Sequence, residues 1–168
     1  MLRFSQHHCG DFLETALDSR KLSEVTGVRA GTLLSWVQRG FVPGMGVEVS
    51  GRRRDFDPET AMHIAVMAEL MPYGLGSPWA SHAAQGAVEA YLAGHPDCMV
   101  VHLTTEKKWS VQTNVGPENT PQAIAQLDAE ERPDVYTVIN IARIAEKIQR
   151  AEAEYQSSRK ARGAKADG

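Results

Sequence analysis

The chain has 168 residues, of which 42% are hydrophobic and 23% are charged, and its formal net charge is -3. This composition is typical of globular proteins, and the length allows one or two small domains that bury a core without disulfide bridges. The negative charge excludes a uniformly basic protein that coats nucleic acid. Cys9 and Cys98 have no CxxC spacing, so the sequence predicts neither a zinc site nor a disulfide framework.

The N-terminus has no charged segment followed by an apolar run, and no apolar stretch approaches the length of a membrane span. We therefore expect a cytoplasmic protein that does not enter a membrane. Residues 1–16 contain His7, His8 and Cys9, which have no partners at metal-ligand spacing. We expect this segment to be a loosely ordered lead-in to the first domain.

Residues 21–43 predict two short helices joined by a tight turn at Gly27. Asp18 or Ser19 can cap the first helix, which we expect to end near Thr26. Gly27 can adopt the positive φ that a turn after a helix often needs.

The second helix is expected from about Arg29 to Arg39, where Gly40 follows as the terminating residue. Leu33, Trp36 and Val37 recur at helical spacing and predict its inner face.

A strand, a turn and a return strand are expected next, over Val47–Val49, residues 50–52 and Arg53–Phe56. Asp57 and Pro58 then form a strong helix start, and the helix should run to about Tyr73. Between residues 20 and 54 there are seven basic and two acidic residues, a local net charge of +5 in a negative protein. A basic surface of this kind is what binding to phosphates requires.

The second half predicts a helix from Ser77 to about Leu92, then a hairpin of strands over residues 98–104 and 109–113. A short helix from Thr120 and a β-rich segment at residues 135–139 follow. The last helix should run from about Asn140 to Tyr155, and residues 157–168 should be a disordered tail because they lack an apolar stripe. The expected apolar stripe of the helix that begins at Ser77 consists of Trp79, Ala83, Ala87, Val88, Tyr91 and Leu92.

Residues 17–76 resemble the winged helix-turn-helix of the MerR-type DNA-binding family. The family pattern is a Thr-Gly-Val turn, a Thr-Leu pair and an aromatic residue in the recognition helix, a Gly-hydrophobic-hydrophobic-Pro exit, and an Arg-x-aromatic strand before a capped helix. The matching residues are Thr26-Gly27-Val28, Thr32-Leu33, Trp36, Gly40-Phe41-Val42-Pro43 and Arg54-Asp55-Phe56.

Two departures from the family pattern limit what can be transferred. Leu34 and Ser35 stand where the family often has arginine and an aromatic residue, and the cysteine pair of its metal-sensing members is missing. Metal sensing is therefore not implied, and no cofactor is expected. The whole chain resembles a small prophage-type regulator, although its C-terminal half matches no particular family.

These observations predict an α+β protein. Residues 17–76 would form a winged helix-turn-helix, and residues 77–156 a small α+β domain for dimerisation or effector binding. A recognition helix in the major groove would place Arg29, Thr32 and Ser35 near base edges or phosphates. The full set of predicted DNA-binding residues is Arg29, Thr32, Ser35, Trp36, Arg39, Arg52, Arg53 and Arg54.

Trp36 has two interpretations, a core residue or a donor of its indole N–H to a phosphate. Three isoleucines of the last helix, Ile141, Ile144 and Ile148, are spaced like the contact positions of a coiled coil. They predict a homodimer, although the core of a single chain could bury them equally well.

The function expected from the sequence is a sequence-specific transcriptional regulator that binds double-stranded DNA as a dimer on a palindromic operator, with the transcription machinery as a further candidate partner. One alternative is a phage excisionase-like or DNA-packaging protein that marks or bends DNA. Another is a ligand-gated sensor that uses its C-terminal domain. The histidines have no HxH or HExxH spacing and no nucleophile motif is present, so we expect no enzyme.

Overall fold

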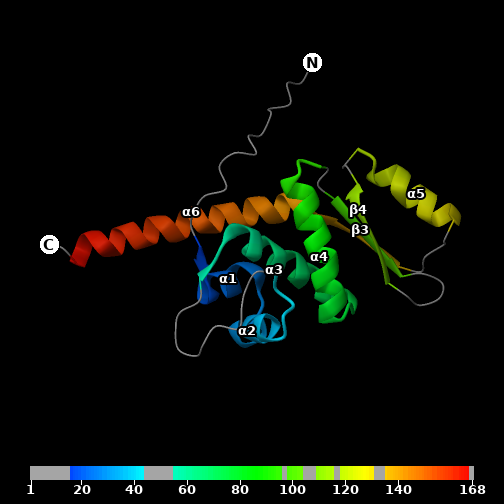
Figure 1. The fold of residues 1–168 in the computed structure, drawn as a ribbon. Coiled ribbons are helices and arrows are strands. Elements are labelled where there is room, and N and C mark those ends of the chain that lie inside the picture. The colour runs from blue at the N-terminus through cyan, green and yellow to red at the C-terminus, as the bar shows by residue number, and fades with distance from the viewer. Residues whose placement is uncertain are drawn as a thin grey trace, which may run out of the picture.

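The fold is that of a computed structural model, which describes residues 16–43, 55–95, 98–103, 109–115, 118–130 and 135–166. Helices dominate these residues, and the strands form one two-stranded and one three-stranded sheet. The expected α+β class is therefore confirmed. Figure 1 shows the N-terminal helices gathered beneath one long C-terminal helix, with the three-stranded sheet at one end.

Helices α1 (Ser19–Thr26) and α2 (Ala30–Gln38) form the predicted helical pair. Asp18 caps α1, because its Oδ1 accepts a hydrogen bond of 2.8 Å from the backbone N–H of Lys21. Gly27 ends α1 with φ of +74°, a conformation that side chains with a Cβ rarely adopt. Both local predictions are confirmed.

The two-stranded sheet pairs β1 (Leu17–Asp18) with β2 (Asp55–Phe56) in antiparallel orientation. Leu17 lies opposite Phe56, and neither side chain has exposed surface. The expected return strand is thus confirmed for its last two residues, with β1 as its partner. The strand expected at Val47–Val49 and the turn at residues 50–52 lie outside the described residues.

Helix α3 (Pro58–Leu70) is the centre of the molecule, and the short 3₁₀ turn η1 (Met71–Tyr73) follows it. Asp57 caps α3 as predicted, accepting from the backbone N–H of Thr60 at 2.8 Å. Every residue from Thr60 to Met67 is buried, because α1, α4 and α6 contact α3 on different sides. A helix that is surrounded in this way needs apolar residues on all its faces.

Helix α4 (Ser77–Leu92) packs against α3 through small side chains, which let the two helices approach closely. The prediction that Trp79 belongs to its buried stripe is wrong, since Trp79 is 65% exposed. The first buried residue of the stripe is Ala80, which lies about 100° around the helix from Trp79. Its buried residues are Ala80, Ala83, Ala84, Ala87 and Val88.

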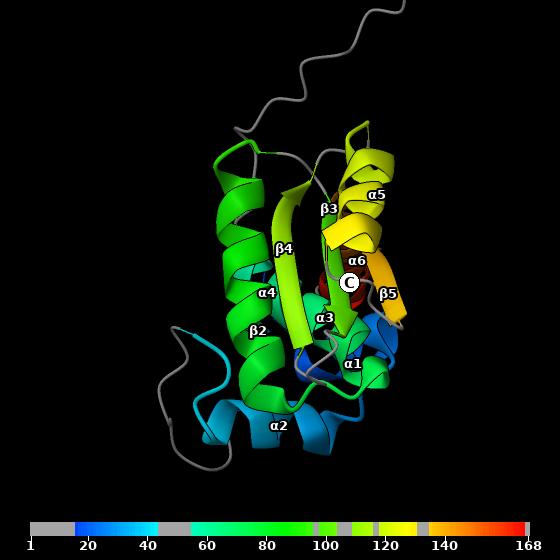
Figure 2. The same ribbon diagram turned by 90° about the vertical axis from the view of Figure 1, so that its right-hand side faces the viewer.

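The second sheet has the strand order β4-β3-β5, and both pairings are antiparallel. Strands β3 (Cys98–Leu103) and β4 (Trp109–Val115) form the predicted hairpin, and β5 (Val135–Asn140) pairs with the other edge of β3. Helix α5 (Thr120–Glu130) connects β4 to β5 along the chain. Strand β4 runs beside α4, which joins the sheet to the helical part (Figure 2).

Helix α6 (Ile141–Ala166) is longer than predicted. The expected end near Tyr155 is wrong, and residues 157–166 of the expected disordered tail are helical. Arginine, lysine and alanine are good helix formers, and extending a packed helix costs much less than starting a new one. The extension carries α6 past the helical body toward the C-terminus (Figure 1).

One buried cluster connects the segments expected to be separate domains. It includes Leu33 and Phe56 from residues 17–76 and Ala84 and Ile148 from residues 77–156. The core of the described residues is therefore continuous across the expected boundary at Gly76, which is itself exposed.

Candidate nucleic-acid interface

Helix α2 has one buried face and one exposed face, as an amphipathic recognition helix requires. Leu33 and Val37 have no exposed surface, and Trp36 is 5% exposed. These residues anchor α2 in the core. The core interpretation of Trp36 and Leu33 is therefore supported by their burial.

The polar residues predicted to contact DNA lie on the other side of α2. Arg29, Thr32 and Arg39 are exposed, and Ser35 is half-buried. Thr32, Ser35 and Arg39 follow one another at intervals of three and four residues and so share one stripe of the helix. The structure thus brings these predicted residues to one surface, with Arg29 at the start of the helix.

Arg29 occupies the N-cap position of α2 with an extended backbone, and its carbonyl accepts hydrogen bonds from Thr32 and Leu33 at 2.8 and 3.1 Å. In the described part of the chain, no carboxylate forms an ion pair with Arg29 or Arg39. Two guanidinium groups therefore stand at the two ends of α2, and no carboxylate of the described residues competes for them. Free backbone N–H groups in the first turn of a helix add a further attraction for a phosphate.

The turn between α1 and α2 is held by two hydroxyl groups. Ser23 Oγ donates to the carbonyl of Val28 at 2.6 Å, and Thr26 Oγ1 donates to the carbonyl of Leu22 at 2.8 Å. Thr26 Oγ1 also accepts from the backbone N–H of Val28 at 3.3 Å. These bonds fix where α2 begins relative to α1.

A buried polar contact holds the exit from α2, and no sequence pattern predicts it. The carbonyl of Phe41 accepts hydrogen bonds from Ser81 Oγ at 2.6 Å and from His63 Nε2 at 3.1 Å. His63 is buried, and this burial lowers its pKa, while the bond to Phe41 acts in the opposite direction. His63 is therefore a neutral core residue that ties the end of α2 to α3 and α4.

The remaining predicted site residues are the arginine run before β2 and the three isoleucines of α6. Arg52, Arg53 and Arg54 lie outside the described residues. Ile141, Ile144 and Ile148 are 2%, 7% and 2% exposed, because they pack into the core of their own chain. The prediction that these isoleucines pair two chains is thus not supported. They are instead buried within one chain, which was the alternative.

Comparison with models of protein families and with curated proteins finds no match to this chain. The described residues contain no cluster of three or more side chains suited to hold a metal ion. None of the helices within those residues is long and apolar enough to cross a membrane.

Proposed function

We propose that the protein is a sequence-specific transcriptional regulator that inserts α2 into the major groove of double-stranded DNA. The observation that carries this proposal is the division of α2 into a core-anchored face and a polar outer face with free arginines at both ends. A rigid helix presented in this way can contact base edges in the major groove. No other described helix combines a preceding tight turn with this distribution.

The position of each side chain suggests its role. Arg29 would contact a guanine or a phosphate, Thr32 and Ser35 would contact base edges, and Arg39 would contact the backbone. Leu34, which is 37% exposed on the outer face, could pack on a thymine methyl group. Leucine at this position, rather than arginine, would favour A·T pairs there.

We also propose that the protein binds DNA as a dimer. A single recognition helix makes few base contacts, and useful discrimination against a genome of random sites calls for two half-sites. The dimer contacts would involve side chains that are exposed in the single chain, because the isoleucines of α6 are buried. Light scattering at micromolar concentration is expected to report twice the mass of one chain without DNA, and the mass of two chains plus one duplex when a DNA site is added.

Genome-wide mapping of the DNA sites that the protein binds tests the function most directly. Binding at promoters, with an inverted repeat in the recovered sites, would support a regulator. Recovery of attachment or packaging sequences would instead favour the excisionase-like alternative. Recovery of no enriched sequence would contradict sequence-specific binding.

The change Arg29→Ala is expected to weaken binding to the specific site by about 1–3 kcal/mol if Arg29 contacts a base. Arg150→Ala is the matched control, because Arg150 is exposed on α6, away from α2. Titrations with specific and random duplexes measure the effect. An equal loss on both duplexes would show that Arg29 contacts a phosphate and contributes no base recognition.

Replacing Arg52–Arg54 with glutamine is expected to lower affinity for any DNA and to flatten its salt dependence. Each lost phosphate contact reduces the slope of log K against log salt by about 0.9. The control replaces three basic residues of α6 with glutamine, Arg143, Lys147 and Arg150, all exposed. An unchanged slope in the first variant would show that the arginine run does not contact DNA.

A further inference from the structure

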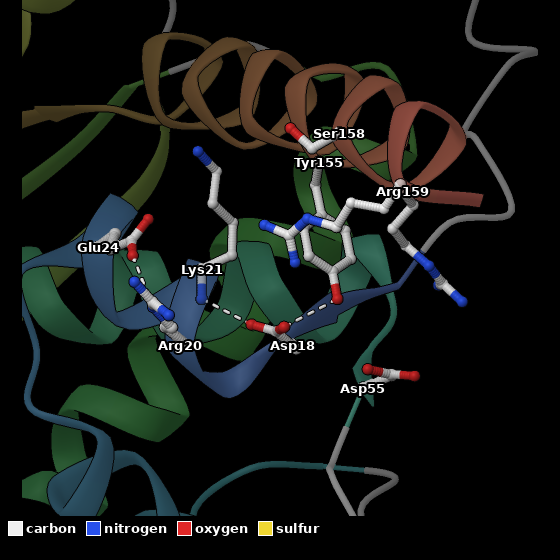
Figure 3. A pocket seen from close by; sticks show the side chains of 9 residues that line it. Asp18, Arg20, Lys21, Glu24, Asp55, Tyr155, Ser158 and Arg159 are labelled. Atoms are coloured by element: carbon white, nitrogen blue, oxygen red, sulfur yellow. Dashed lines mark hydrogen bonds and ion pairs between the residues drawn. The ribbon is translucent and has the colours of Figure 1, made fainter. Parts of the chain in front are cut away.

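A pocket of about 320 Å³ lies where the C-terminal half of α6 passes over α1 and the two-stranded sheet (Figure 3). Its walls come from three parts of the chain that are far apart in sequence. Such a volume is at the lower end of the range of small-molecule sites, about 300–1,000 Å³. The predicted DNA contacts on α2 do not include any of the residues around this pocket.

The floor of the pocket is rigid and polar. Asp18 is 2% exposed, and its Oδ2 accepts a hydrogen bond of 2.8 Å from the hydroxyl of Tyr155. Its Oδ1 is the cap of α1. At the edge, Lys21 Nζ lies 3.1 Å from Glu154 Oε2, a second link between α1 and α6. The two walls are therefore held in place before any ligand arrives.

Two guanidinium groups of α6 line this pocket, and neither pairs with a carboxylate of the described residues. Arg159 lies over the ring of Tyr155, 5.9 Å from its centroid, and Arg162 follows one turn later. The ion pairs seen among the described residues, Arg20 with Glu24 and Lys21 with Glu154, involve neither of them. Figure 3 shows the Arg159 side chain reaching along the pocket beside Lys21 and Tyr155.

We propose that this pocket binds a small ligand that carries a phosphoryl group. Guanidinium groups bind phosphate through two parallel hydrogen bonds, and both Arg159 and Arg162 line this pocket. Arg159 and Arg162 together suit a doubly charged group better than a single carboxylate. Asp55, exposed at the opposite wall, can accept a hydrogen bond from a hydroxyl elsewhere on the ligand.

The same pocket is poorly suited to the backbone of DNA. Helix α6 and helix α2 lie on opposite sides of the helical body in both views (Figures 1 and 2). A duplex seated on α2 would therefore approach from the other side. The proposed site does not depend on DNA binding.

Calorimetry and thermal melting of the full-length protein with inorganic phosphate and pyrophosphate test the proposal, at constant ionic strength. Saturable binding and a rise in melting temperature are expected. The double change R159Q/R162Q should weaken binding at least tenfold, while glutamine preserves helix propensity. K160Q is the matched control, because Lys160 is exposed on the same turn of α6 but does not line the pocket.

Equal affinities in wild type, K160Q and R159Q/R162Q would overturn the proposal. The absence of saturable heat would also overturn it, if phosphate and pyrophosphate were added in about 10-fold excess over millimolar protein, because concentrations of that order fill weak sites. A duplex of random sequence tests whether the phosphates that the pocket binds belong to the DNA backbone. If R159Q/R162Q lost affinity for that duplex and the duplex displaced pyrophosphate, the pocket would be a DNA-backbone contact and the small-ligand proposal would fail.

Discussion

Trp36→Ala is expected to destabilise the protein by about 3–5 kcal/mol, the usual cost of removing a buried aromatic side chain. Trp36 is 5% exposed and belongs to the same cluster as Leu33 and Val37. The change leaves a cavity between α2 and the rest of the core. Urea denaturation followed by circular dichroism measures the loss.

A matched control is available in Trp79, which is 65% exposed. Trp79→Ala is expected to change the free energy of unfolding by less than about 0.5 kcal/mol, as surface substitutions usually do. Similar losses for the two variants would contradict the position of Trp36 in the core.

The change Trp36→Phe separates the two roles considered for this residue. Phenylalanine keeps most of the buried area but lacks the indole N–H, so a core residue would leave DNA affinity close to that of the wild type. A loss of affinity in a variant that remains folded would show that the indole also contacts a phosphate. The measurement is a DNA titration at a temperature well below the melting transition.

The elements that could be predicted from the sequence are those fixed by neighbouring residues. Asp18 and Asp57 cap helices with their own side chains, and Gly27 supplies a positive φ. Each of these signals acts within one turn of helix, so no knowledge of distant contacts is required. The polar outer face of α2 was predictable for the same reason, because helical spacing alone separates it from Leu33 and Val37.

The features that were missed depend on residues far apart in the chain. Strand β1 has two residues, too short to show a period, and it exists because Leu17 and Phe56 pack together across the sheet. The burial of the α6 isoleucines depends on α3, which a coiled-coil pattern cannot reveal. Asp18 and Tyr155 likewise meet only because α6 crosses the N-terminal helices.

The α2 surface and the α6 pocket are connected through α1. Asp18 starts α1 and is held by Tyr155 of α6, while Ser23 and Thr26 near the other end of α1 fix the turn into α2. A ligand that bridges α1 and α6 would therefore stabilise the helix from which α2 is positioned. We therefore expect the affinity for DNA to change when phosphate occupies the pocket.

Glu152 is the least satisfied polar group in the described part of the chain. It is 1% exposed, and its Oε1 has no hydrogen-bond partner among the described residues. Burial, followed by the negative charge of Asp57, raises the pKa of Glu152 from 4.5 to about 7. The folded protein therefore favours the protonated carboxyl group.

The sign of the pH effect follows from the direction of that pKa change. Because the folded pKa lies above the unfolded one, the folded state holds the proton more tightly, and stability decreases as pH rises from 4.5 toward 7. Above that range the ionised carboxylate costs about 3 kcal/mol, at about 1.4 kcal/mol for each pH unit between the two pKa values. His63 acts oppositely, since its lowered pKa removes stability as pH falls through 6.5.

Glu152→Gln is accordingly expected to be more stable than the wild type at pH 8, by up to about 3 kcal/mol, and close to it at pH 5. Both proteins retain His63, so its contribution cancels when their free energies of unfolding are subtracted at each pH. Glu146→Gln is the control, because Glu146 is exposed on the same helix. Urea denaturation between pH 5 and 8 gives the difference curve. A difference that stays constant with pH would show that Glu152 is ionised in the folded protein throughout, and that α6 packs on α3 without holding a proton at this position.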